Sequence, residues 1–142
     1  MECIIDKKSL QGVLKKIQKC VSSNSKVLEI ASSVLVQVKN KKMLLKATNY
    51  NMYIEDTVGD LKVKTEGEVL IPFSLFKNLV NKYPADKIHI REKDNNLELV
   101  SGNNLFEIPI VNLEFPESYT VENEIEIEIE EGAAKEIFKR FS

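Results

Sequence analysis

Hydrophobic and polar positions along the chain follow the same pattern three times. Each repeat opens with a short apolar strand, and the three strands end at Ile5, Ile71 and Ile129. Apolar residues follow 5, 8, 9 and 12 positions after each of these isoleucines. The residues at these positions are Leu10, Val13, Leu14 and Ile17, then Phe76, Leu79, Val80 and Tyr83, and finally Ala134, Ile137, Phe138 and Phe141. Residues three and four apart share one face of a helix, so the spacing predicts three amphipathic helices in a pseudo-symmetric protein.

The first repeat predicts a helix over about Ser9–Val21, followed by strands. Apolar residues then alternate in three short segments separated by polar turns, which indicates an antiparallel meander. The predicted strands are Val34–Val38, with one buried face, Met43–Thr48 and Met52–Val58. A tight turn is expected at Asn40-Lys41, and Gly59–Gly67 is the expected hinge between the two halves.

The second repeat follows the same plan. Ser74 is a candidate cap for a helix that runs to Tyr83 and is stopped by Pro84. Three further strands are predicted at Lys87–Glu92, Leu97–Ser101 and Leu105–Ile110. Val111–Glu122 is expected to be an extended linker. Glu124–Glu130 alternates strictly between glutamate and isoleucine, which predicts a strand with one solvated face.

These elements predict an α+β fold in which each half is a strand, a helix and three strands. The half-repeats cover residues 1–66 and 67–121, and residues 122–142 hold only the opening strand and helix of a third unit. Two helices on one face of an antiparallel sheet satisfy the need to bury apolar surface between layers. The opposite faces of the helices are then left to solvent or to a ligand.

The composition is that of an ordinary soluble globular protein. Apolar residues make up 43% and charged residues 30% of the 142 residues, and the net charge is −2. No apolar run reaches the roughly 20 residues of a membrane span, and no secretory signal is visible. We therefore expect a cytoplasmic protein without membrane contact, in which Cys3 and Cys20 are reduced and buried.

Residue patterns typical of catalysis are weak in this sequence. His89, the single histidine, lies in an alternating segment that predicts a solvent-side strand position. The glutamates of Glu124–Glu131 are spread along one strand face, which favours solvation over a cation site, and Thr48–Asn51 is typical of a turn. Neither a nucleophile elbow nor a glycine-rich phosphate loop is present. We predict a protein that is not an enzyme, with no catalytic residues, no metal and no cofactor.

Basic residues project from the helices away from the apolar stripes. They are Lys8, Lys15 and Lys19 on the first helix, Lys77 and Lys82 on the second, and Lys135, Lys139 and Arg140 on the third. One interpretation is a merely solvated surface. The other is a surface that faces phosphates, since positive charges on helices attract a polyanion without reading its sequence.

The order of these motifs resembles the bacterial sliding clamp family, the beta subunit of DNA polymerase III. The resemblance covers essentially the whole chain. It rests on the order and spacing of short motifs: the opening strand with Leu10-x-x-Val13-Leu14, then Val34–Val38, Leu45–Met52, Val69–Pro72, Leu99–Gly102 and Phe106-x-Ile108, and finally Glu114-Phe115-Pro116, where the chain leaves the first domain. It implies that residues 1–121 are the first clamp domain and residues 122–142 the beginning of the second. The chain departs from the family at Asn49, where aspartate is common, and at Asn103 and Leu105, where basic residues are common.

Members of this family form rings of two protomers, with helices lining the hole and antiparallel sheets outside. The resemblance therefore implies a processivity subunit that encircles duplex DNA without sequence readout, with a second clamp protomer and, for the full-length protein, the polymerase and clamp loader as partners. The residues expected to face DNA are Lys8, Lys15, Lys19, Lys26 and Lys77. The residues expected at the ring seam are Leu75, Leu79, Tyr83, Phe106 and Ile108.

Two further expectations follow. The alternative function, from a different class, is a stand-alone interaction module that binds a peptide along an exposed strand edge such as Leu105–Ile110. The third unit stops after its helix, which predicts a fragment of a longer clamp whose last apolar stripe packs on the first domain or on another copy.

Overall fold

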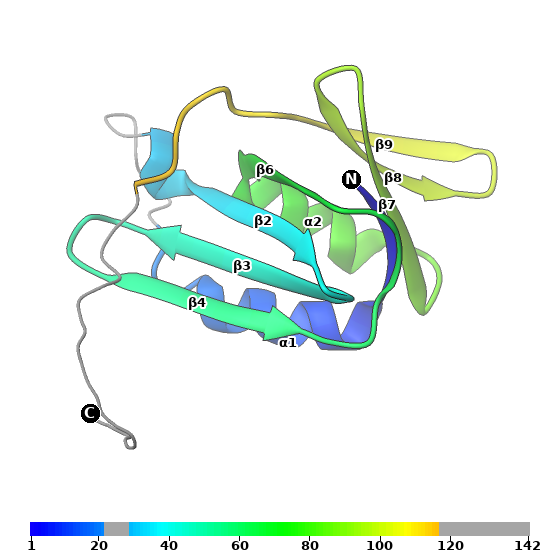
Figure 1. Cartoon of the computed structure of the whole chain (residues 1–142), viewed down its shortest axis with the longest axis horizontal. Coiled ribbons are helices and arrows are strands. Elements are labelled where there is room, and N and C mark those ends of the chain that lie inside the picture. Colours follow the sequence, from blue (N-terminus) through cyan, green and yellow to red (C-terminus); the bar gives the residue numbers. More distant parts are fainter. Residues whose placement is uncertain (22–28, 117–142) are drawn as a thin grey trace.

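The computed structural model describes residues 1–21 and 29–116, which form two antiparallel sheets and two helices (Figure 1). In chain order the elements are β1 (Glu2–Asp6), α1 (Lys7–Ile17), the short 3-10 helix η1 (Glu29–Ser32), β2 (Ser33–Lys39), β3 (Lys42–Thr48), β4 (Tyr53–Val58), β5 (Lys62–Thr65), β6 (Gly67–Pro72), α2 (Phe73–Lys82), β7 (Lys87–Lys93), β8 (Asn96–Ser101) and β9 (Asn104–Pro109). The α+β class and the alternation of strands and helices are confirmed. The third repeat, Glu124–Phe141, lies outside the described residues. Neither described helix is long and apolar enough to cross a membrane.

The two halves exchange their opening strands. The five-stranded sheet has the order β5-β1-β7-β8-β9, so β1 pairs with a strand of the second half. The four-stranded sheet has the order β4-β3-β2-β6, so β6 pairs with β2 of the first half. Each half thus completes the sheet of the other, and residues 1–116 make one structural unit.

The predicted hinge at Gly59–Gly67 is wrong, because it contains β5. This strand pairs with β1 through Cys3 and Val63 and carries the chain from one sheet to the other. Its pattern was too short and too polar to predict, since Lys62 and Lys64 are exposed. At the return into β6 the backbone of Gly67 lies against Met1, where an added Cβ would be 3.1 Å from Met1 Cβ.

The helices pack against the sheets and share one core with them (Figure 1). The stripe of α1, Leu10, Val13, Leu14 and Ile17, is buried, as are Phe76 and Val80 of α2. Burial of each such side chain contributes about 1.5–3 kcal/mol of transfer free energy to folding. The apolar positions that repeat in the sequence are therefore positions of the core. Cys3 and Cys20 are buried free thiols, and burial raises the pKa of Cys3 to about 11.

The helix ends differ from those predicted. Helix α1 begins at Lys7 instead of Ser9 because Asp6 is its N-cap, accepting hydrogen bonds from the Ser9 N–H at 3.0 Å and the Ser9 hydroxyl at 2.9 Å. It ends at Ile17, and the chain tightens into turns that leave Lys19 beyond the helix. Ser74 is not a cap, since α2 starts at Phe73, directly after Pro72.

The tight turns agree with the sequence. Asn40 and Lys41 form the two-residue turn between β2 and β3, and Asp94 and Asn95 form the one between β7 and β8. All four residues have positive φ, between 52° and 64°. Turns of this type match the twist of the strands they join.

Candidate nucleic-acid interface

The outward surface of α1 is basic because the helix is amphipathic and contains no acidic residue. Its apolar stripe faces the core, and Lys8 and Lys15 are exposed. Lys19 is exposed in the turn after the helix. Helix α2 also lacks acidic residues, and it carries Lys77 and Lys82. A surface built from both helices therefore has a positive potential that no helical carboxylate offsets.

The two helices lie side by side and are joined by polar side chains. The Gln11 amide donates to Asn81 Oδ1 at 3.0 Å, and the Lys77 ammonium donates to Gln18 Oε1. Beside this second contact is a hollow of about 360 Å³, lined by Gln18, Val21, Phe73, Ser74, Lys77 and Asn78. These contacts link the outward sides of the two helices.

The lysines of the helices divide into engaged and free ones. Lys7 Nζ donates to the Tyr83 carbonyl at 2.6 Å, and Lys16 pairs with Asp56 of β4 at 3.3 Å. In contrast, Lys8, Lys15 and Lys19 have no ion-pair or hydrogen-bond partner among the described side chains. Exposed cations of this kind can exchange water for a phosphate at little cost.

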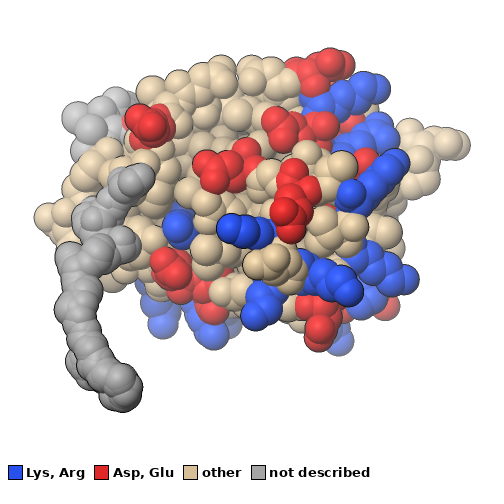
Figure 2. Space-filling view, viewed as in Figure 1, with Lys and Arg blue, Asp and Glu red and all other residues tan. Residues whose placement is uncertain are grey.

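The face of the four-stranded sheet has a different character. Figure 2 shows acidic and basic side chains mixed over the face that β2, β3 and β4 form. Along the sequence, residues 1–116 carry 17 basic and 14 acidic residues, whereas residues 117–142 carry 3 and 8. The negative net charge of the whole chain thus comes from its last segment, and the domain itself is slightly positive.

The structure places four of the five predicted DNA-facing residues. Lys8 and Lys15 lie on α1, Lys19 follows it, and Lys77 is half-buried on α2 against Gln18. Lys26 lies outside the described residues. The sequence pattern did not single out the polar side chains between the helices, Gln11, Gln18 and Asn81, although their helical spacing places them on the same outward side.

The predicted seam residues fall into two groups. Leu75 is 37% exposed, while Leu79 and Phe106 are partly buried. Tyr83 and Ile108 are 4% and 0% exposed, so both belong to the core of their own domain and offer little surface to a partner. The Tyr83 hydroxyl donates to the Val100 carbonyl and accepts the His89 N–H, which accounts for its burial.

The titratable groups of the five-stranded sheet make structural pairs. His89 Nε2 lies 2.6 Å from Glu2 Oε2, and this hydrogen bond, helped by Lys64, holds the pKa of Glu2 below its usual range. Arg91 Nε donates to the buried Glu98 at 2.7 Å. Among residues 1–21 and 29–116, no group of three His, Cys, Asp or Glu side chains is placed to hold a metal ion. The remaining candidate for function is the basic helix surface.

Comparison with known sequences gives consistent matches. Residues 1–120 match the family model of the DNA polymerase III beta subunit, N-terminal domain. The beta sliding clamp of Mycoplasma pneumoniae is 32% identical over 98 residues, which are 68% of this chain and 26% of the relative. The beta sliding clamp of Mycoplasma genitalium is 25% identical over 118 residues, 82% of this chain and 31% of the relative. The chain therefore spans about a quarter to a third of the length of these curated relatives.

Solved structures show the same fold. The Helicobacter pylori beta clamp bound to a DNA ligase peptide superposes with a TM-score of 0.79 at 22% identity, covering 86% of this chain and 34% of that chain. The beta subunit from the DNA polymerase of Streptococcus pyogenes superposes with a TM-score of 0.80 at 20% identity, covering 89% and 35%.

Proposed function

Because the chain belongs to the family of the DNA polymerase III beta subunit, we propose that it supplies the first domain of a sliding clamp that encircles duplex DNA. Residues 1–121 form this domain and residues 122–142 begin the second. The subunit is non-catalytic and raises processivity by enclosing DNA and tethering the polymerase, after a clamp loader has placed it there.

The observation that carries this proposal is the acid-free surface of α1 and α2. Lys8, Lys15 and Lys19 are exposed and unpaired within the described part of the chain, whereas Lys16 is held by Asp56. Lys77 and Lys26 complete the set proposed to face phosphates. Point charges that attract the backbone through water and contact no base edge give affinity without sequence readout, which permits sliding.

The ring seam follows from the open edge of the five-stranded sheet. Strand β9 is the last strand of that sheet, and the exposed Leu105 and half-buried Phe106 lie on it. We place the contact with the second protomer there, with Leu75 and Leu79 of α2 beside it. Tyr83 and Ile108 support this edge from within the core.

Salt dependence of duplex binding tests the DNA-facing surface. Replacing Lys8, Lys15 and Lys19 by Gln should lower the slope of log K against log salt by about 0.9 for each phosphate that is no longer neutralised. The matched control replaces Lys39, Lys41 and Lys42, exposed on the β2–β3 hairpin, and should leave the slope unchanged. Equal slopes for both triple variants would show that the helix lysines only solvate the surface.

A further inference from the structure

The turn between β3 and β4, residues 48–52, lies against the end of α1. The Cys20 thiol donates to the carbonyl oxygens of Ala47 at 3.5 Å and of Met52 at 3.6 Å. Figure 1 shows this turn and the end of α1 at the same end of the four-stranded sheet. Lys19, which directly precedes Cys20, is exposed. The turn of residues 48–52 therefore adjoins the basic helix surface at its rim.

The backbone of this turn is held by hydrogen bonds from its own side chains. Asn49 Oδ1 accepts the N–H of Asn51 at 2.9 Å and the N–H of Met52 at 2.7 Å. The Thr48 hydroxyl donates to the Met52 carbonyl at 2.8 Å and accepts the Tyr50 N–H at 3.0 Å. Tyr50 has a φ of 73°, which is uncommon for a residue with a large side chain. The turn therefore holds Tyr50 in a backbone conformation that this residue rarely adopts.

Two large side chains of the same turn are exposed to solvent. The exposed fraction is 51% for Tyr50 and 49% for Met52. The Tyr50 ring contacts no other aromatic ring, and its hydroxyl makes no hydrogen bond with any described residue. Residues 48–52 contain no carboxylate, and the neighbouring Lys19 adds a positive charge. An exposed aromatic ring beside a cation is typical of surfaces that bind single-stranded nucleic acid, where bases stack on the ring and cations attract the phosphates.

We propose that Tyr50 stacks on an unpaired DNA base at the point where a single strand leaves the duplex, with Lys19 beside the adjoining phosphate. The inference rests on the proposed function, since it requires duplex DNA on the helix surface. Paired bases are covered by their neighbours in the duplex, whereas an unpaired base has a face free to stack. Stacking accepts any base, because every base has a π face. The contact thus holds the domain at junctions between duplex and single strand without reading sequence.

The test compares binding of residues 1–142 to a blunt duplex and to the same duplex extended by a short single strand of thymidines. Fluorescence anisotropy at low salt should give at least about fivefold tighter binding of the extended duplex, as expected for one stacked base. With 2-aminopurine as the first unpaired base, binding should also quench its fluorescence.

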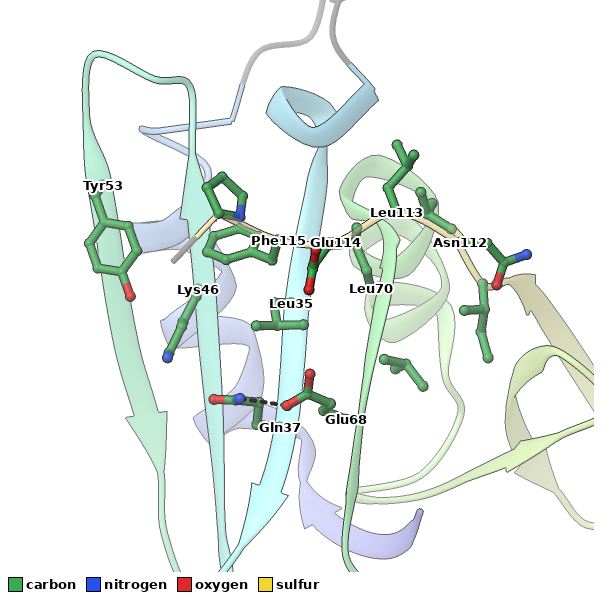
Figure 3. A pocket seen from close by; sticks show the side chains of 14 residues that line it. Leu35, Gln37, Lys46, Tyr53, Glu68, Leu70, Asn112, Leu113, Glu114 and Phe115 are labelled. Carbon is green, nitrogen blue, oxygen red and sulfur yellow. Dashed lines mark hydrogen bonds between the residues drawn. The ribbon is translucent and has the colours of Figure 1, made fainter. Parts of the chain in front are cut away.

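Three variants assign the preference to the aromatic ring. Tyr50→Leu keeps an apolar side chain but has no ring, and it should bind the extended duplex only as tightly as the blunt one. Tyr50→Phe keeps the ring and should keep the preference. Leu113→Ala is the matched control, because Leu113 is 49% exposed on residues 110–116, over the outer face of the four-stranded sheet (Figure 3), and it should also keep the preference.

The blunt duplex separates this inference from the proposed function. Salt-sensitive binding of the blunt duplex with no preference for the extended one would overturn the role of Tyr50 and leave the proposed function intact. A preference that persists in Tyr50→Leu, or is lost in Tyr50→Phe, would do the same. No salt-sensitive binding to either DNA would overturn the proposed function and this inference together.

Discussion

Arg91 and Glu98 stand opposite each other on β7 and β8, and Glu98 is a charged residue inside the sheet. Its exposed fraction is 4%, and its Oε1 accepts the Arg91 Nε–H at 2.7 Å. A buried carboxylate without its partner retains the cost of desolvation. We expect Arg91→Met to lower the free energy of unfolding by about 2–4 kcal/mol, less than for a fully buried pair because Arg91 is one-third exposed.

Urea unfolding measures this effect as a lower midpoint at an unchanged slope. Lys93→Met, exposed on the same strand, is the control and should change the free energy of unfolding by less than about 0.5 kcal/mol. A midpoint for Arg91→Met equal to that of the control would contradict this prediction.

Glu2 joins β1 to β7 through His89 and gives stability a defined dependence on pH. The His89 hydrogen bond lowers the pKa of Glu2 in the folded state below its ordinary value of 4.5. The contribution of Glu2 is therefore fully present above about pH 4.5 and is lost as the pH falls through the lower folded-state pKa. Glu2→Gln should flatten the fall in stability below pH 4.5, as measured by urea unfolding between pH 3 and pH 6. Parallel curves for the two proteins would contradict this.

At the scale of single residues, the sequence predicted which lysines face outward but not which of them are free. Helical spacing places Lys8 and Lys15 opposite the apolar stripe. Lys16 and Lys77 are engaged by Asp56 and Gln18, which are distant from them in sequence. Contacts of this kind depend on the tertiary fold, and periodicity carries no information about them.

At the scale of elements, the predicted strands and helices were mostly correct because their apolar periods are strong. Strand β5 was missed because its short, polar pattern resembles a loop. The alternating pattern of Val34–Val38 predicted one buried face, but Val111 and Phe115 also cover Leu35 on the other face. The exchange of β1 and β6 could not be predicted, since the repeat shows that two halves exist but not which sheet each opening strand joins.

This exchange predicts that neither half folds alone. Residues 1–66 lack β7, the main partner of β1, and residues 67–116 lack β2, the partner of β6. Each separate half should be unfolded by circular dichroism and should gain strand signal when the two are mixed at equal concentration. A stable sheet in either half alone would show that the exchange is not required for folding.

At the scale of the whole molecule, the two faces of the domain differ in charge. The helix side carries lysines without acidic neighbours in the helices, and the sheet side carries mixed charges and a groove under residues 110–116. Both surfaces rest on one core that spans the two sheets, so substitutions on one side should leave the other intact.

Topological retention on DNA is the property that distinguishes an enclosing clamp from a basic surface. A polypeptide of residues 1–142 covers only 34% of the solved Helicobacter pylori clamp chain, so we expect that it cannot enclose DNA by itself. It should bind nicked circles and the same DNA linearised equally weakly, in a salt-sensitive manner, because only charge attraction acts. Co-elution of the protein with circular and with linear DNA in gel filtration measures this binding. The variant in which Lys8, Lys15 and Lys19 are all replaced by Gln should co-elute with neither DNA. Loader-dependent retention on circles alone would instead show that these 142 residues suffice to form a closed ring.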